Sequence, residues 1–152
     1  MQAAAVVLER VALLPIHVIL EDNVSTFLDF IPTIIPAKNN MNWHTLTSEE
    51  QLEQVKLASN TKPQLLFKHS TRCSISSMAL NRLNREADFP NVDFHLLDLI
   101  AYRNVSKKIA DDFEVQHQSP QILLIKNGLC IFDESHGGIN MQEIIEQAAL
   151  AI

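Results

Sequence analysis

The chain has 152 residues, 47% of them hydrophobic and 20% charged, which is the composition of an ordinary globular protein with a core large enough to be stable. The formal net charge of -6 argues against a basic surface that would follow a nucleic-acid backbone. Its two cysteines, Cys73 and Cys130, are too few for a disulfide-stabilised secreted scaffold. We therefore expect a protein of a reducing compartment, the cytoplasm, with no nucleic-acid partner.

The first forty residues differ from the rest. Their apolar runs have no clear helical or strand period, and Pro32 and Pro36 interrupt them. The longest run is also broken by Arg10 and Pro15, so we expect neither a signal peptide nor a membrane span, and no membrane partner. The pattern favours an extension, residues 1–40, that arises from a start assigned too early or packs poorly, ahead of a domain at residues 41–152. A packed helical cap is the alternative.

Regular elements begin after residue 41. A short strand at Trp43–Leu46 precedes Thr47–Glu50, which reads as a capping box in which the Thr47 hydroxyl and the Glu50 carboxylate each bond a free backbone N–H group. The helix that starts there ends before Asn60, and the apolar run Gln64–His69 predicts a central strand.

A second helix is expected from Cys73 to about Glu86, where Ile75, Met78, Ala79 and Leu83 are spaced to form one apolar face. The remaining elements are a strand from Val92, a helix over 104–113, strands at 122–126 and 129–133, and a helix at about 140–149. The two last strands flank Asn127–Gly128, the strongest short signal for a type I′ hairpin.

The element order β-α-β-α-β-α-β-β-α is typical of a thioredoxin-like α/β fold, with a mixed central sheet and helices on both of its faces. In such a fold, the helix after the first core strand begins at the carboxyl edge of the sheet, where ligands bind in open α/β sheets. The order therefore predicts that Cys73 lies at this edge, at a helix N-terminus.

The position of Cys73 favours a reactive thiolate. A helix N-terminus stabilises an anion, and Arg72, Lys68 and His69 would add positive potential, while the Ser76 hydroxyl could donate a hydrogen bond to the sulfur. Dithiol oxidoreductases have a second cysteine where this chain has Ser76, so the site is predicted to be monothiol. The alternative is an inert cysteine that fills the core, a role we assign to Cys130.

Two further segments are candidates for the same site. Ser119–Pro120 precedes a strand at the position where thioredoxin folds hold a cis peptide against the active-site cysteine, although a proline at the start of a strand is also routine. Gly137–Gly138 before the last helix could form a nest of N–H donors for the carboxylate of a thiol cofactor, or be a plain turn. Asn140 could be the helix N-cap or a ligand contact.

No metal site is expected, because His69, His117 and Cys73 lack ligand spacing on a common element.

Three segments together resemble a known family. "KHSTRCSISS", "LLDLIAYRNVSKKIADDFEVQHQSPQILLIKNG" and the pair Ser135–His136 resemble the YtxJ-type bacillithiol-system proteins, which are thioredoxin-fold monothiol bacilliredoxins. The resemblance extends from Met41 to about Ile152, and "NWHTLTSEEQLEQV" is similar to the N-terminus of that family.

The resemblance implies an enzyme that removes bacillithiol from S-thiolated client proteins. Cys73 would attack the mixed disulfide, Ser76 would mark the monothiol site, and Ser119–Pro120 would form the cis-proline wall. Bacillithiol, or a similar low-molecular-weight thiol, would be a co-substrate, and no tightly bound cofactor is expected. Two alternatives stay open: a glutaredoxin-like carrier of an iron–sulfur cluster, and a thioredoxin-fold adaptor with an inert cysteine.

Overall fold

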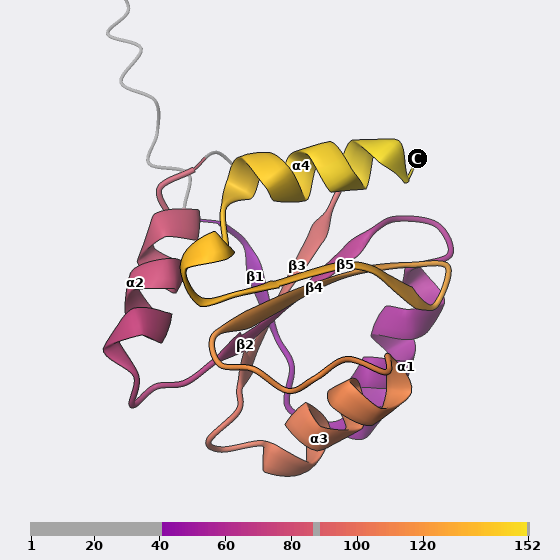
Figure 1. The fold of residues 1–152 in the computed structure, drawn as a ribbon. Coiled ribbons are helices and arrows are strands. Elements are labelled where there is room, and N and C mark those ends of the chain that lie inside the picture. The colour runs from indigo at the N-terminus through magenta and orange to yellow at the C-terminus, as the bar shows by residue number, and fades with distance from the viewer. Residues whose placement is uncertain (1–40, 87–88, 152) are drawn as a thin grey trace, which may run out of the picture. The chain divides into compact units, whose positions relative to one another are not determined.

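The computed structural model describes residues 41–86 and 89–151, and within them five strands form one mixed sheet (Figure 1). Their order across the sheet is β1-β3-β2-β4-β5. The first three strands in this order run parallel, whereas β4 runs antiparallel to both β2 and β5. The strands are β1 (Trp43–Thr45), β2 (Gln64–His69), β3 (Asp93–Asp98), β4 (Gln121–Lys126) and β5 (Leu129–Ser135).

Helices cover both faces of the sheet, as the sequence predicts. Alternate residues of β2 serve the two faces: Leu65 and Phe67 pack with the helices α2 and α4, and Leu66 packs with α1 and α3. The helices are α1 (Glu49–Ala58), α2 (Ser74–Leu83), α3 (Arg103–Asp112) and α4 (Met141–Leu150), with a 3₁₀ turn, η1 (His136–Gly138), before α4.

The predicted extension, residues 1–40, lies outside the described residues, so the predicted domain boundary at residue 41 stays a prediction. Among the residues that the structure describes, no helix combines the length and the hydrophobicity needed to cross a membrane.

The cap of α1 differs from the prediction by one residue. Ser48, not Thr47, is the N-cap: its hydroxyl accepts from the Gln51 N–H group at 3.2 Å, and the Gln51 side chain accepts in return from the Ser48 N–H group at 3.3 Å. Gln51 Oε1 also accepts from the Thr47 N–H group at 2.7 Å. Because Gln51 satisfies both donors, Glu50 is not needed in the box and remains exposed.

The buried face of α2 also differs from the predicted one. Ala79 and Leu83 are buried as expected, but Ile75 is 48% and Met78 61% exposed, and Ser76 is fully buried instead. The helix can bury Ser76 because its hydroxyl finds hydrogen-bond partners inside the protein. Two apolar side chains are thereby left on the surface, within the first two turns that follow Cys73.

The hairpin between β4 and β5 is confirmed. Asn127 and Gly128 have φ values of 52° and 73°, the positive values that a type I′ turn requires at both central residues. Their N–H groups bond Ser59 at the end of α1, the first to its carbonyl at 3.0 Å and the second to its hydroxyl at 2.8 Å.

Candidate active site

One edge of the sheet gathers the predicted site residues. β2 and β3 run parallel, so their last residues, His69 and Asp98, lie side by side, and the His69 carbonyl accepts from the Leu99 N–H group at 2.9 Å. β4 runs antiparallel and begins with Gln121 opposite Lys68, which brings the preceding residues 119–120 to this same edge. The chain continues from His69 through a short loop into α2.

Cys73 is the N-cap residue of α2, at the position the sequence predicts. Its backbone is extended, with φ -111° and ψ 118°, and its carbonyl accepts from the Ser77 N–H group at 3.0 Å. Among the described residues no side chain caps the helix, and Cys73 is a free, partly exposed cysteine. The N–H groups of the first helical turn have no partner within the helix, so they can stabilise a negative charge on a group held at the N-cap.

The cationic surroundings of Cys73 are weaker than the sequence indicates. Arg72 is exposed beside the cysteine in the chain. Burial lowers the pKa of His69 below its usual range, with the Asp98 carboxylate acting in the opposite direction, so His69 is neutral at neutral pH. Lys68 is fully buried and bonds His117 and Gln121. Among the three expected cations, Arg72 is therefore the one that adds exposed positive charge next to the cysteine.

The predicted hydrogen bond from Ser76 to the cysteine sulfur is wrong, because the Ser76 hydroxyl bonds other residues. The Ser76 hydroxyl lies 2.7 Å from His69 Nδ1 and accepts from the Ser70 N–H group at 3.0 Å. It therefore joins α2 to the end of β2 and to the loop that leads to Cys73. Ser76 still occupies the place of a second cysteine, but it acts on the cysteine by holding this loop.

We expect Ser76→Ala to lower the free energy of unfolding by about 1–3 kcal/mol, because it leaves the buried Ser70 N–H group and the His69 ring without their partner. Ser77→Ala is the matched control: its hydroxyl makes one partly buried bond of 3.3 Å to the Cys73 carbonyl, and its loss should cost less. Urea unfolding of the two variants measures the difference. Equal destabilisation would contradict the anchoring role of Ser76.

The Ser119–Pro120 peptide bond is cis, as the sequence predicts. Pro120 is buried, and its carbonyl accepts from the His136 N–H group at 3.1 Å. The His136 ring lies 3.2 Å from Gln118 Oε1. The proline segment and the turn η1 are thus bonded to each other at the edge where β2 ends.

The two glycines of η1 lie beside a carboxylate of the protein itself. A Cβ atom added at Gly138 would collide with the Glu134 side chain, so Glu134 lies against the turn. Neither Gly137 nor Gly138 has a positive φ value, and Asn140 is the N-cap of α4, accepting from the Glu143 N–H group at 2.9 Å. The geometry gives Asn140 a capping role, and the nearby carboxylate disfavours binding an anion at the glycine pair.

Cys130 lies on the other side of the sheet from α2. It packs against the apolar cluster formed with α1 and α3, and its Sγ donates to the Phe132 carbonyl at 3.4 Å. Burial and the charge of Asp133 raise the pKa of its thiol to about 11. Cys130 is therefore neutral at physiological pH and cannot serve as a partner sulfur for Cys73.

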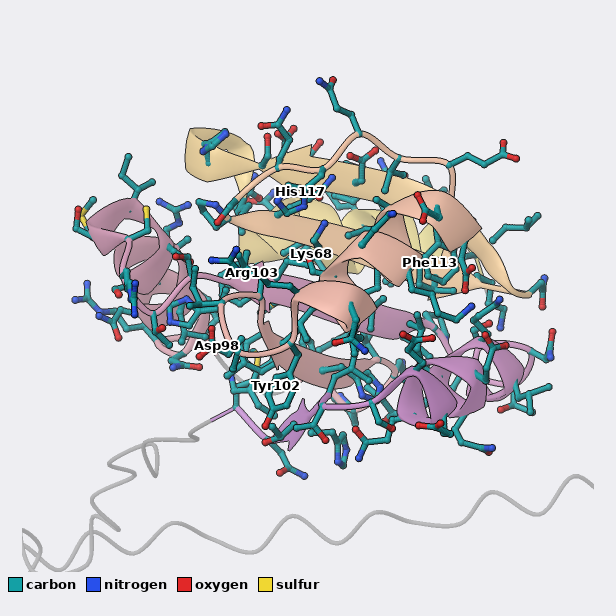
Figure 2. All side chains as sticks on the ribbon, turned by 90° about the horizontal axis from the view of Figure 1, so that it is seen from below. Lys68, Asp98, Tyr102, Arg103, Phe113 and His117 are labelled. Atoms are coloured by element: carbon teal, nitrogen blue, oxygen red, sulfur yellow. The ribbon has the colours of Figure 1, made fainter. Side chains whose placement is uncertain are left out.

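A buried polar network near the edge was not predicted. Lys68 Nζ lies 2.7 Å from His117 Nδ1 and donates to Gln121 Oε1 at 3.1 Å (Figure 2). The one signal in the sequence is a lysine near the end of an apolar central strand. Its partners follow only from the register of β2 against β4, which the residue pattern does not specify.

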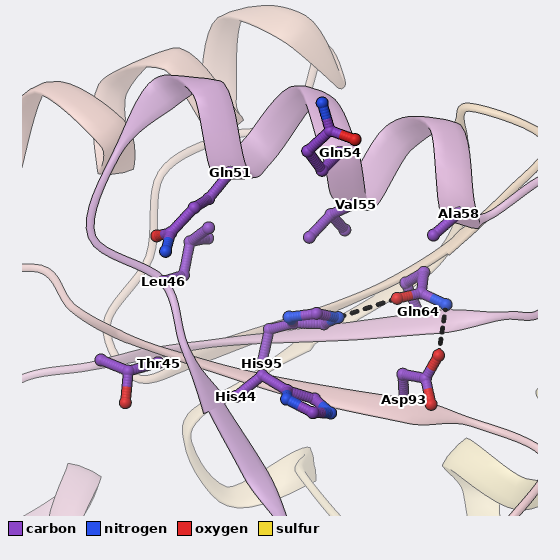
Figure 3. Close-up of a pocket in the computed structure, with 10 residues that line it drawn as sticks. All are labelled: His44, Thr45, Leu46, Gln51, Gln54, Val55, Ala58, Gln64, Asp93 and His95. Carbon is purple, nitrogen blue, oxygen red and sulfur yellow. Dashed lines mark hydrogen bonds between the residues drawn. The ribbon is translucent and has the colours of Figure 1, made fainter.

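A cavity of about 350 Å³ lies at the opposite end of the sheet, between α1 and the strands β1, β2 and β3 (Figure 3). It contains a chain of hydrogen bonds: the His95 ring lies 2.8 Å from Gln64 Oε1, and Gln64 Nε2 donates to Asp93 Oδ2 at 2.9 Å. Gln64 and Asp93 are the first residues of β2 and β3, whereas Cys73 follows the end of β2. This cavity is therefore separate from the edge that holds the cysteine.

We expect His95 to make the fold sensitive to acid. Burial and the neighbouring His44 lower its pKa to about 4, so between pH 6.5 and 4 the unfolded chain binds a proton that the folded protein does not. Stability should fall through this range by roughly 2 kcal/mol, allowing for partial exposure of the ring.

The measurement is urea unfolding of the native chain and of His95→Gln at pH 7 and pH 4.5, with the exposed His136→Gln as control. His95→Gln should lose less stability than the native chain on acidification. An identical loss in all three proteins would contradict the assignment.

Comparisons with known proteins agree with this fold. The model of the family "Monothiol bacilliredoxin BrxC" matches residues 44–144. A solved structure of a candidate oxidoreductase with a thioredoxin fold is 31% identical, with a TM-score of 0.59, over 68% of this chain and 90% of that chain.

Thioredoxins share the fold at lower identity. That of Malassezia sympodialis is 16% identical, with a TM-score of 0.58 over 74% of this chain and 93% of its own. The thioredoxin of Fasciola hepatica is 17% identical, with a TM-score of 0.55 over 72% of this chain and 99% of its own. The predicted thioredoxin-like fold is confirmed.

Proposed function

The chain belongs to the monothiol bacilliredoxin family, and from this premise we propose that it removes bacillithiol, or a similar low-molecular-weight thiol, from S-thiolated proteins by exchange at Cys73. The observation that supports this most is the place of Cys73: a free, partly exposed cysteine at the N-cap of α2, where no side chain of the part of the chain that the structure describes caps the helix. We place the activity in a reducing compartment, the cytoplasm, and assign the chain to the YtxJ type.

The first step transfers the small thiol to the protein. The Cys73 thiolate attacks the bacillithiol sulfur of the client's mixed disulfide, a new Cys73–bacillithiol disulfide forms, and the client sulfur leaves as a thiolate that takes a proton from water. The client is then reduced, and Cys73 carries the bacillithiol.

The second step requires an external thiol. The side chain one helical turn after Cys73 is the hydroxyl of Ser76, which cannot form a disulfide, and Cys130 lies on the other face of the sheet. A second low-molecular-weight thiol attacks the mixed disulfide on Cys73, leaves as a low-molecular-weight disulfide, and restores the Cys73 thiolate. In sum, the client's mixed disulfide and one free small thiol are converted into the client thiol and one low-molecular-weight disulfide.

The surface beside Cys73 suits a protein client. Ile75 and Met78 are 48% and 61% exposed on α2, so two apolar side chains border the segment that carries the cysteine. An apolar contact would help to hold a client whose modified cysteine must reach the Cys73 sulfur.

Intact-mass spectrometry tests the proposal. A protein modified by one bacillithiol is mixed with an equal amount of this chain. We expect the client to lose one bacillithiol and this chain to gain one, and digestion to place the adduct on the peptide that contains Cys73. Excess free bacillithiol should then remove the adduct from Cys73. Loss of the modification from the client without any adduct on Cys73 would overturn the mechanism, and an unchanged client would overturn the function.

A further inference from the structure

A pocket of about 500 Å³ lies between α3 and the loop that leads to the cis proline, a volume typical of small-molecule sites. Its lining includes Leu99 just after β3, four polar residues of α3, and His117 of the loop. We call it the Arg103 pocket, after Arg103 at the start of α3. None of the steps described above uses it.

The charge of the Arg103 pocket is mainly positive. Arg103 and Lys107 are one turn apart on α3, both are exposed, and neither forms an ion pair with the residues that the structure describes. Asp111 is the one carboxylate that lines the pocket. Two cations held on one rigid helix are suited to bind the oxygens of an anionic group.

A buried lysine adds positive charge behind the pocket. Lys68 is fully buried, and its Nζ contacts His117 Nδ1 and Gln121 Oε1 but no carboxylate in residues 41–86 and 89–151. The Asp133 carboxylate accepts from Gln121 at 3.3 Å and so reaches the lysine only through the amide. Buried cations are usually paired with an anion, and here the protein supplies none in direct contact.

His117 connects this lysine to the pocket. Its Nδ1 accepts from Lys68, so the proton of the neutral ring is on Nε2, which is then a donor. Burial and the charge of Lys68 both lower the pKa of the ring and keep it neutral. Figure 2 shows Lys68, His117 and Arg103 on the same side of the sheet, the side that α3 covers.

An unpartnered hydroxyl provides independent evidence for a ligand. Ser106 lines the pocket, is 4% exposed, and its Oγ has no hydrogen-bond partner among the described residues. Buried hydroxyl groups without a partner are uncommon in folded proteins. The Ser106 Oγ atom is itself closed to solvent, so it would donate to a bound oxyanion once the side chain turns toward the pocket.

The pocket belongs to the edge of the sheet that holds Cys73. The Leu99 N–H group bonds the carbonyl of His69, the last residue of β2 before the loop to Cys73, and His117 precedes the cis proline in the same loop. We propose that the Arg103 pocket binds a carboxylate of the low-molecular-weight thiol whose sulfur is exchanged at Cys73. This inference rests on the proposed function. It assigns the contact with the carboxylate of the small thiol to α3, in place of the glycine pair of η1 that the sequence suggested.

Binding is tested first in the absence of exchange, with the full chain carrying Cys73→Ser. Mercaptosuccinate, which bears two carboxylates, and inorganic phosphate are titrated separately while amide NMR signals are followed. We expect mercaptosuccinate to shift signals of α3 and of residues 115–118, with at least about a 10-fold weaker affinity after Arg103→Gln or Lys107→Gln. Arg85→Gln, an exposed arginine after α2, is the matched control and should change nothing.

Exchange kinetics then assign the occupant. One client is prepared with mercaptosuccinate and, separately, with uncharged 2-mercaptoethanol on the same cysteine. In an otherwise native chain, Arg103→Gln should raise KM about 10-fold for the first substrate and leave the second unchanged. Equal effects on both substrates, or NMR shifts with phosphate but not with mercaptosuccinate, would overturn the inference. Failure of the native chain to exchange either substrate would instead overturn the proposed function, while the titration still reports on the pocket.

Discussion

Replacing Cys73 by serine should abolish transfer of bacillithiol from a modified client, with a rate loss of at least about 10³-fold, because a serine hydroxyl is not ionised at neutral pH and cannot form a disulfide. The helix N-terminus would remain, since serine is a good N-cap residue, so the variant should fold. The rate is measured by the appearance of the free client thiol under single-turnover conditions.

Cys130→Ser is the control for this experiment. Cys130 is partly buried, its pKa is raised to about 11, and it packs on the face of the sheet opposite to α2. Its replacement should leave the transfer rate within about twofold of the native one. Comparable losses in both variants would show that the two sulfurs act together, which contradicts a monothiol mechanism.

Lys68→Met should change how stability depends on pH. Burial lowers the pKa of Lys68 to about 8, far below that of a lysine in the unfolded chain. Below pH 8 the folded protein therefore contains a buried, charged lysine, which costs stability. Between pH 8 and 10.5 the folded protein loses this proton while the unfolded chain keeps it, and stability rises with pH. The whole contribution is roughly 3 kcal/mol.

The difference between Lys68→Met and the native chain isolates this contribution, because Cys130 and the other groups titrate in both. Methionine leaves Gln121 Oε1 bonded to the Gln118 N–H group at 3.1 Å, and His117 is exposed enough to bond water. The free energy of unfolding of Lys68→Met minus that of the native chain should fall by roughly 3 kcal/mol from pH 7.5 to pH 10.5. A difference that is constant with pH would contradict the buried charge.

The sequence predicts correctly those features that depend on neighbouring residues in the chain. The order of the elements follows from apolar patterns, the hairpin follows from Asn127–Gly128, and the N-cap position of Cys73 follows from the strand and helix on either side of it. The cis form of Ser119–Pro120 was predicted from the fold and is confirmed. These features depend on a few neighbouring residues or on the fold as a whole.

The errors have a different origin, because each depends on a competition between side chains. Gln51 rather than Glu50 closes the cap of α1, since it bonds two N–H groups at once. Ser76 turns toward His69 and Ser70, so its burial rotates α2 and exposes two apolar side chains that its pattern assigned to the core. Sequence spacing gives the faces of a helix but does not say which polar group finds a partner inside.

The residues that were missed are distant in sequence. Lys68, His117 and Gln121 meet through the pairing of β2 with β4, and the Arg103 pocket combines α3 with a loop that follows it. Neither contact leaves a motif in the chain. The predicted glycine contact came from a pattern of two residues, which could not reveal that Glu134 lies against it.

The claim on which this account depends is that Cys73 is an accessible, reactive sulfur at the amide end of α2. Alkylation of the native chain by iodoacetamide at pH 7, followed on the separate peptides of Cys73 and Cys130, tests it directly. We expect Cys73 to react at least about 100-fold faster, because the raised pKa of Cys130 leaves roughly one thiol in ten thousand ionised at this pH. Equal rates for the two cysteines, or modification of Cys73 only after unfolding in denaturant, would contradict the account.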